Sequence, residues 1–260
     1  MNNLVHVRVW GNWACFTRPE MKVERVSYQL PTPSAARGIL EAIFWEPEMY
    51  YIIDSIRVIK KGIWTSFKRN EVQKTISLNN VKKWMQDSNS LEVIIAGAGE
   101  DTSATPRNTL ALQDVEYIIS AEVHLTELGK KSRQSPQKYI KEFTSRAKLG
   151  KCFHRPYLGV REFAAYFELV EDPTVAHQTS LKQLGALKWN ELLGLMLYDI
   201  FDHEDRAEGF RYLVQATKTS ITTEGKFLKP TAYFFQAEIK DSVMDCHPSR
   251  VKIIRRNGGL

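Results

Sequence analysis

The chain has 260 residues, 43% of them hydrophobic and 25% charged, which is an ordinary composition for a globular protein with a substantial core. No uncharged apolar run approaches the roughly 18 residues of a membrane span, and the N-terminus lacks the apolar stretch of a signal peptide, so we expect a cytoplasmic protein without a membrane partner. The three cysteines lie far apart and the six histidines form no metal-binding spacing, which predicts reduced thiols, no metal and no cofactor.

The first part of the chain predicts one helix among extended segments. Thr32 is a good N-cap with Pro33 at the first helical position, and apolar residues then recur at helical spacing until Pro47 stops the run. Alternating or continuous apolar patterns indicate four extended segments, at residues 4–10, 23–30, 50–60 and 63–72.

The rest of the chain predicts two more helices and several strands. A short helix is expected over residues 81–86, before a polar loop, and a longer one over residues 136–149, opened by Ser135 and Pro136 and closed by Gly150. Strand patterns cover residues 110–127, 164–170, 193–201, 210–216 and 231–239. This order predicts an α+β fold with a ferredoxin-like (RRM-like) domain over residues 1–171 and a smaller antiparallel β-rich domain over residues 172–260, which ends in a basic tail.

The positive charge of the protein is concentrated in one segment. Residues 130–155 contain nine Lys or Arg and one acid, Glu142, and so carry +8, whereas the whole chain carries +6. A local excess of this kind on an amphipathic helix indicates a binding site for a polyanion, with nucleic acid as the first hypothesis. A solvated helix face is the alternative interpretation of the charge.

A helical wheel over residues 136–149 separates an apolar stripe from a cationic face. The stripe contains Tyr139, Ile140, Phe143 and Ala147. The cationic residues on the other side are Lys138, Lys141 and Lys148, with Arg146 near the edge beside Tyr139. We therefore expect the Tyr139 ring to lie in the core and its hydroxyl at the boundary.

Three passages resemble one family closely. They are RVWGNWACFTRPEMKVERVSYQLPTPSAARGILEAIFW at residues 8–45, RNTLALQDVEYIISAEVHLT at 107–126 and KYIKEFTSRAKLGKCFHRPYLGVREFAAYFEL at 138–169. Together they resemble the Cas5 proteins of type I-C CRISPR systems, the subtype-d endoribonucleases of the RAMP superfamily. The resemblance implies the same two-domain α+β organisation that the patterns predict.

The resemblance also implies a function. Members of the family cut the repeat hairpin of precursor CRISPR RNA without a metal, through attack of a ribose 2′-hydroxyl on the neighbouring phosphate, which gives a 2′,3′-cyclic phosphate and a 5′-hydroxyl. They then stay on the 5′ handle of the guide RNA within the Cascade complex, together with its other subunits. We expect the free protein to be a monomer.

The family's catalytic positions correspond to Lys138, Tyr139 and Phe44 of this chain. Lys138 matches the family pattern and is expected to stabilise the charge that builds on the phosphoryl oxygens. Tyr139 stands where the family has histidine, and we expect the neighbouring lysine to lower its pKa from about 10. Phe44 has no proton to transfer and is expected to pack or stack. His154 is a further candidate to assist this pair, and phosphate contacts are expected from Arg18, Lys22, Arg25, Arg107, Lys148 and Arg161.

Two interpretations of these replacements remain open. In the first, cleavage persists with Lys138 and Tyr139 as the central pair. In the second, the protein is a catalytically weak or inactive RNA-binding subunit that caps the 5′ handle, an interpretation that the phenylalanine at position 44 favours.

Overall fold

The computed structural model describes residues 3–72, 77–91, 104–201, 203–204, 206–207 and 231–255. Its named strands are β1 (Leu4–Ala14), β2 (Arg25–Val26), β3 (Met49–Val72), β4 (Ala104–Leu125), β5 (Tyr166–Leu169), β6 (Glu191–Asp199), β7 (Tyr233–Lys240), β8 (Val243–Asp245) and β9 (Ile253–Arg255). Its named helices are α1 (Pro33–Ile43), α2 (Leu78–Gln86), α3 (Glu127–Lys131), α4 (Pro136–Lys148) and α5 (Pro173–Leu184), with 3-10 turns η1 (Pro19–Met21) and η2 (Ser88–Ser90).

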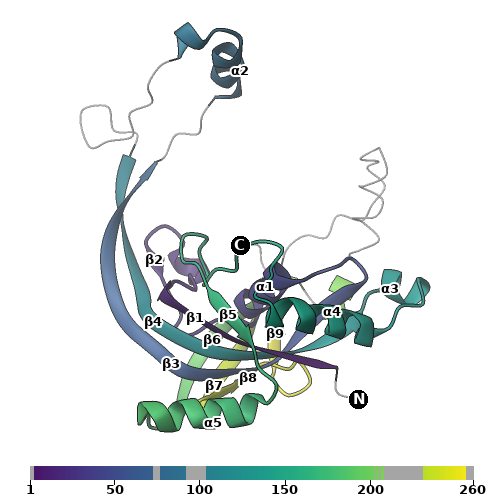
Figure 1. The fold of residues 1–260 in the computed structure, drawn as a ribbon. Helices are drawn as coiled ribbons and strands as arrows, with labels where there is room; N and C mark the ends of the chain where they lie inside the picture. The colour runs from purple at the N-terminus through teal and green to yellow at the C-terminus, as the bar shows by residue number, and fades with distance from the viewer. Residues whose placement is uncertain are drawn as a thin grey trace.

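The strands form one sheet in the order β5-β1-β4-β3-β8-β7-β6 (Figure 1). Every neighbouring pair along this path is antiparallel, whereas the short β2 pairs in parallel with β4 at one margin. The first four strands of the path come from the N-terminal part of the chain, and β8 joins β7 and β6 to the edge of β3. The α+β architecture expected from the sequence is therefore confirmed, and the domain boundary at residue 171 stays a prediction.

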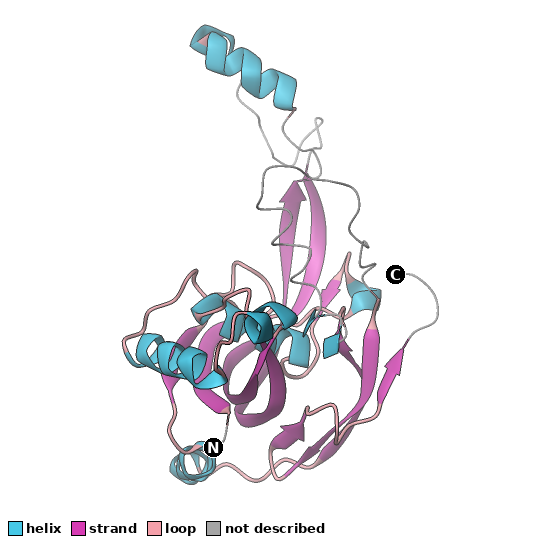
Figure 2. Ribbon diagram, turned by 90° about the vertical axis from the view of Figure 1, so that its right-hand side faces the viewer, coloured by secondary structure: helices cyan, strands magenta, loops and turns pink. Residues whose placement is uncertain are grey.

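Two long strands dominate this sheet. The sequence predicted separate strands at residues 50–60 and 63–72, but β3 is continuous and pairs with β4 along almost its whole length. The glycine between the two predicted segments, Gly62, has a φ of +80° and leaves the strand unbroken. Beyond this point the side chains of β3 are exposed or half-buried, and the strand pair extends away from the body of the molecule (Figure 2).

Helix α1 begins as its sequence predicts. The Thr32 hydroxyl accepts a hydrogen bond from the backbone N–H of Ala35 at 3.1 Å, and Pro33 occupies the first turn, where its missing N–H costs nothing. Ala36, Ile39, Leu40 and Ile43 are buried, as the apolar spacing requires. Phe44 follows as the C-cap and places the end of α1 beside α4.

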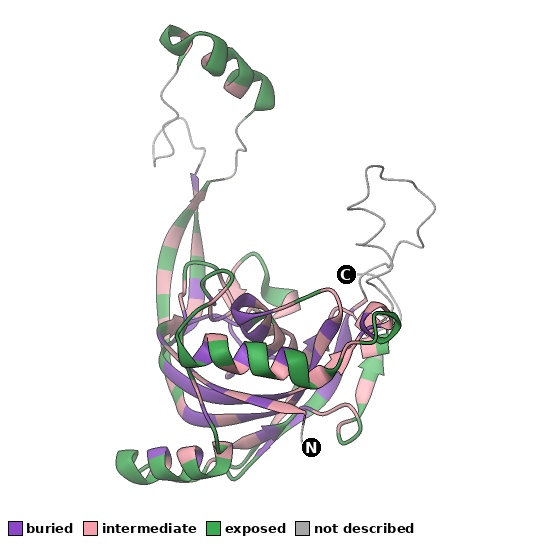
Figure 3. Ribbon diagram, turned by 45° about the vertical axis from the view of Figure 1, so that its right-hand side comes forward, coloured by how far each residue is buried: buried purple, intermediate pink, exposed green. Residues whose placement is uncertain are grey.

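Helices cover both faces of the sheet (Figures 1 and 3). Helices α1 and α4 contact each other on one face, and α5 packs against β3 and β4 on the other. Between the first pair and the sheet lies an apolar core, in which the rings of Tyr51 and Phe143 meet edge to face at 5.9 Å. The buried side of α4 is therefore fixed against the strands, and its other side faces outward.

Some local predictions were wrong. Of the extended segment predicted at residues 23–30, only Arg25–Val26 forms a named strand, β2, and Ser27 adds a single antiparallel bridge to Thr17. Helix α5 was not anticipated, although Asp172 caps it through the N–H groups of Thr174 and Val175. The strand predicted at residues 210–216 lies outside the described residues.

Across the part of the chain that the structure describes, no helix has the length and apolar character needed to cross a membrane.

Candidate active site at the junction of α1 and α4

Helix α4 presents the cationic face that its sequence predicts. The Ser135 hydroxyl accepts from the N–H of Gln137 at 3.2 Å to start the helix, and Gly150, with a φ of +64°, follows its end. Tyr139, Phe143 and Ala147 are buried. The side chains of Lys138, Lys141 and Lys148 are exposed on the outer side.

The three predicted catalytic residues lie around one cavity. Phe44 enters it from the end of α1, and Lys138 and Tyr139 enter it from the first turn of α4. The cavity has a volume of about 770 Å³, and its other lining residues are Glu46, Glu48, Lys141, Glu142, Ser145 and Arg146. Residues about 90 positions apart in the sequence are thus brought to a single hollow beside the basic helix face.

The Phe44 ring has no proton to transfer, but it contacts a cation, Arg146. Its backbone carbonyl accepts a hydrogen bond from the Tyr51 hydroxyl at 2.7 Å, which fixes the residue at the helix end. The guanidinium carbon of Arg146 lies 5.1 Å from the ring centroid, within cation–π range. The Glu142 carboxylate accepts from Nε of the same arginine at 2.8 Å. Arg146, which the sequence placed only at the edge of the cationic face, is therefore held over the cavity.

Lys138 provides a second positive charge at the cavity. Its ammonium donates to Oε1 of Gln134 at 2.9 Å and lies 5.3 Å from the centroid of the Tyr139 ring. The side chain remains exposed, so the ammonium is accessible to a polyanion. Two cations from the same helix thus flank the position of Tyr139.

Tyr139 differs from the sequence prediction in its hydroxyl group. The residue is only 3% exposed, and within the described residues its buried hydroxyl has no hydrogen-bond partner. Burial raises the pKa of Tyr139, and the nearby carboxylates of Glu48 and Glu46 raise it further. The expectation that the neighbouring lysine lowers this pKa was therefore wrong, because desolvation and two acids from the α1–β3 connection dominate. A phenol of this kind stays protonated near neutral pH and so has a proton to donate.

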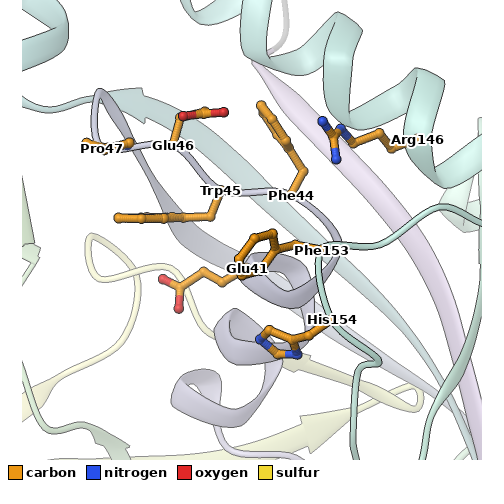
Figure 4. A pocket seen from close by; sticks show the side chains of 8 residues that line it. All are labelled: Glu41, Phe44, Trp45, Glu46, Pro47, Arg146, Phe153 and His154. Carbon is orange, nitrogen blue, oxygen red and sulfur yellow. The ribbon is translucent and has the colours of Figure 1, made fainter.

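A second cavity of about 540 Å³ adjoins the first. Phe44, Glu46 and Arg146 line both, and the second is completed by Glu41, Trp45, Pro47, Phe153 and His154 (Figure 4). His154 is exposed, and its Nδ1 lies 3.3 Å from the carbonyl oxygen of Arg155. The structure thus places His154 beside the predicted catalytic group, on the far side of Phe44.

The predicted phosphate-binding residues occupy two regions. Lys148 is the last residue of α4, whereas the other five lie near η1, the outer part of β4 and the loop before β5. Arg25 forms ion pairs with Glu71 at 3.2 Å and with Glu162 at 3.7 Å, so much of its charge is already balanced. The guanidinium of Arg18 stacks 4.9 Å from the Tyr28 ring centroid. The roles of all six in RNA binding remain predictions.

Sequence reasoning missed the acidic side of the site. Glu46 and Glu48 flank Pro47 directly after α1, and both line the larger cavity together with the cations. The short acidic run was visible in the sequence, but nothing local indicated that it would meet α4. Among the described residues, no group of three or more His, Cys, Asp or Glu side chains is arranged to hold a metal ion.

Comparisons with known proteins identify the class. A family model described as CRISPR-associated protein (Cas_Cas5) matches residues 4–246. A solved structure of a CRISPR-associated protein shares the fold with a TM-score of 0.57 at 20% identity, over 94% of this chain and 91% of that one. A functionally uncharacterized protein from Streptococcus mutans superposes with a TM-score of 0.59 at 16% identity, over 98% of each chain.

Two curated relatives specify the family further. A CRISPR pre-crRNA endoribonuclease Cas5d from Mannheimia succiniciproducens is 37% identical over 259 residues, which cover 98% of this chain and 100% of the relative. A protein of the same name from Thermus thermophilus is 42% identical over 161 residues, or 62% of each chain. The chain belongs to the Cas5d family of CRISPR-associated proteins.

Proposed function

We propose that this protein is an endoribonuclease that cuts the repeat hairpin of precursor CRISPR RNA. The observation that carries the proposal is the convergence of Lys138, Tyr139 and Arg146 on one cavity beside the basic helix face, in a chain that belongs to the Cas5d family. Both curated relatives are named as pre-crRNA endoribonucleases, which supports the same activity here.

The proposed reaction is a transesterification within the RNA. The ribose 2′-oxygen bonds to the adjacent phosphorus and loses its proton, while the bond from phosphorus to the 5′-oxygen breaks and that oxygen gains a proton. The products are a 2′,3′-cyclic phosphate and a 5′-hydroxyl. Because DNA lacks the 2′-hydroxyl, the reaction is specific for RNA.

Four polar groups at the cavity have roles in the proposed reaction. Lys138 and Arg146 stabilise the negative charge that grows on the phosphoryl oxygens. Tyr139 is protonated near neutral pH, and its hydroxyl, which has no hydrogen-bond partner among the described residues, donates a proton toward the leaving 5′-oxygen. We assign the proton acceptor for the 2′-hydroxyl to Glu48, a carboxylate that lines the same cavity. Phe44 positions Arg146 through its ring.

The finer features of the fold and assembly are also part of the proposal. The order β5-β1-β4-β3, with α1 and α4 as the crossing helices, supports a ferredoxin-like domain over residues 1–171. Residues 172–260 then form the smaller β-rich part. After cleavage the protein stays on the 5′ handle of the guide RNA, within a type I-C Cascade complex, and the free protein is a monomer.

A second candidate function is RNA capping without efficient cleavage. The observation that favours it is the lack of a proton-transfer group at Phe44, together with a phenol at Tyr139 whose pKa is raised rather than lowered. In this case the same cations hold the 5′ handle and no bond is broken.

The test is a cleavage assay with the organism's own repeat RNA in EDTA. One discrete product with a cyclic phosphate end supports the nuclease, and a single 2′-deoxy substitution at the cut should abolish the product. An intact, tightly bound repeat would establish the capping function instead. Cleavage that survives the 2′-deoxy substitution would overturn the mechanism. As a control, binding of an all-deoxy repeat measures the general affinity of the protein for polyanions.

A further inference from the structure

The smaller cavity contains an aromatic side chain that packing leaves largely uncovered. Phe153 is 82% exposed, and its ring points into the space between Trp45 and Glu41 (Figure 4). Burying a phenylalanine side chain stabilises a protein by roughly 1.5–3 kcal/mol, and this residue forgoes most of that gain. Single exposed apolar residues are common, so the surroundings of Phe153 decide its significance.

The backbone of Phe153 is held in place. Its N–H donates to the carbonyl oxygen of Ala42 at 2.9 Å, and the N–H of His154 donates to the same oxygen at 3.2 Å. Carbonyls in the last turn of a helix lack intrahelical partners, and these two bonds satisfy one of them at the end of α1. The exposed ring is therefore presented from a fixed position beside Phe44.

Other aromatic and basic groups extend from this ring. The rings of Phe153 and His154 lie 5.9 Å apart, and those of His154 and Tyr157 stack at 6.5 Å with an angle of 21° between their planes. Lys151 and Arg155 lie in the same stretch of chain, which belongs to the segment carrying +8. Aromatic rings interleaved with cations are typical of surfaces that bind single-stranded nucleic acid.

The charges within the smaller cavity favour a base over a phosphate. Glu46, which is exposed, and Glu41, whose carboxylate already accepts from Arg37 at 2.8 Å, line it beside Arg146, so a phosphate placed there meets two carboxylates and one cation. Carboxylate oxygens accept hydrogen bonds from the exocyclic amino groups of adenine, cytosine and guanine. The volume of about 540 Å³ lies within the range of small-molecule pockets. Phosphates are instead accommodated by the cationic face of α4.

We propose that Phe153, together with Trp45 and His154, binds one unpaired nucleobase of the RNA next to the scissile phosphate, and that this base carries an exocyclic amino group. The inference rests on the proposed function for the position of the scissile phosphate, because Phe44 and Arg146 line both cavities. It assigns a stacking and specificity role to residues outside the group at Lys138 and Tyr139.

The experiment uses the full chain and a repeat RNA made uncleavable by a 2′-deoxy substitution at the cut. A single 2-aminopurine, whose fluorescence is quenched by stacking, is scanned through the unpaired nucleotides beside that position. Phe153→Ala and Phe153→Leu should each weaken binding about tenfold and relieve quenching at one nucleotide, whereas Phe153→Trp should retain both. The matched control is Leu149→Ala, which removes another apolar side chain that is 63% exposed and does not line the cavity. This variant should change neither the RNA affinity nor the quenching.

The possible outcomes separate this inference from the proposed function. Unchanged affinity and quenching in Phe153→Ala would overturn the base-binding site even if the all-ribose repeat is cut normally. Quenching that depends on Phe153, with no cutting of the all-ribose repeat, would sustain the site and refute the nuclease. Equal affinity after uracil replaces the quenched base would overturn the requirement for an amino group.

Discussion

The guanidinium carbon of Arg146 lies 5.1 Å from the centroid of the Phe44 ring, across the junction between α4 and the C-terminal end of α1. The aromatic face attracts the cation electrostatically, and Glu142 fixes the guanidinium from the same helix. In the proposed site, a phenylalanine that cannot transfer a proton therefore has the role of positioning a charge.

Arg146→Ala should reduce the cleavage rate by about 10²–10³-fold, because a cation held at the developing phosphoryl charge acts mainly in the transition state. RNA affinity should fall only a few-fold, since the proposed RNA-binding surface contains many other cations. Single-turnover cleavage and filter binding measure the two effects. Lys182→Ala on α5 removes one exposed positive charge elsewhere and serves as the control. Equal losses of rate and affinity in Arg146→Ala would contradict the assignment.

Lys138→Ala should also slow cleavage by about 10²-fold while affinity changes by less than about threefold. Lys138→Arg keeps the charge but changes its geometry, so we expect partial recovery of the rate. The same two assays apply. A variant that binds weakly yet cuts bound RNA at the wild-type rate would leave Lys138 with a binding role alone.

Tyr139→Phe removes only a hydroxyl, and in the described structure that hydroxyl is buried without a partner. We therefore expect the free energy of unfolding to stay within about 0.5 kcal/mol of wild type or to rise. Cleavage should fall by about 10- to 100-fold if the hydroxyl donates to the leaving oxygen. Urea unfolding and single-turnover kinetics check the two halves of this prediction. An unchanged rate would remove Tyr139 from the chemistry.

Glu48→Gln separates catalysis from binding by the direction of its two effects. Loss of the proton acceptor should slow cleavage, whereas loss of a negative charge beside the phosphate should tighten RNA binding. The control, Glu168→Gln, changes a half-exposed acid on β5 that pairs with Arg8 away from the cavity. If Glu48→Gln cuts as fast as wild type, another group takes the 2′-hydroxyl proton.

Buried phenols should make the protein sensitive to alkali. Burial raises the pKa of Tyr51, Tyr117 and Tyr139 above the ordinary value of 10.0, so the folded state keeps protons that the unfolded chain releases. The contribution of these tyrosines to the free energy of unfolding is complete below about pH 10. It is lost as the pH rises further, by up to about 1.4 kcal/mol per pH unit for each tyrosine. Urea unfolding from pH 8 to pH 11 measures how steeply the free energy of unfolding falls with pH. Tyr117→Phe should make that slope shallower, and an unaltered slope would contradict the prediction.

Local signals explain the elements that the sequence predicted well. Thr32 with Pro33, and Ser135 with Pro136, begin helices because their side chains and ring satisfy the requirements of a first turn whatever surrounds them. The structure confirmed both helices. The extended segment predicted over residues 23–30 is paired only in part, because β2 pairs with Thr109 and Leu110 and Ser27 bridges Thr17, and partners so far away in the chain are invisible to local pattern.

Local patterns were enough to predict the α+β class, the capped basic helix and the division of that helix into a buried stripe and a cationic face. Each depends on residues within a few turns of one another. The contact between Phe44 and Arg146, and the influence of the acids after α1 on Tyr139, arise from packing between elements and could not be predicted in this way. The proton affinity of that phenol depends on burial and on charges about 90 residues away in the chain, and these are set by packing between elements rather than by local pattern.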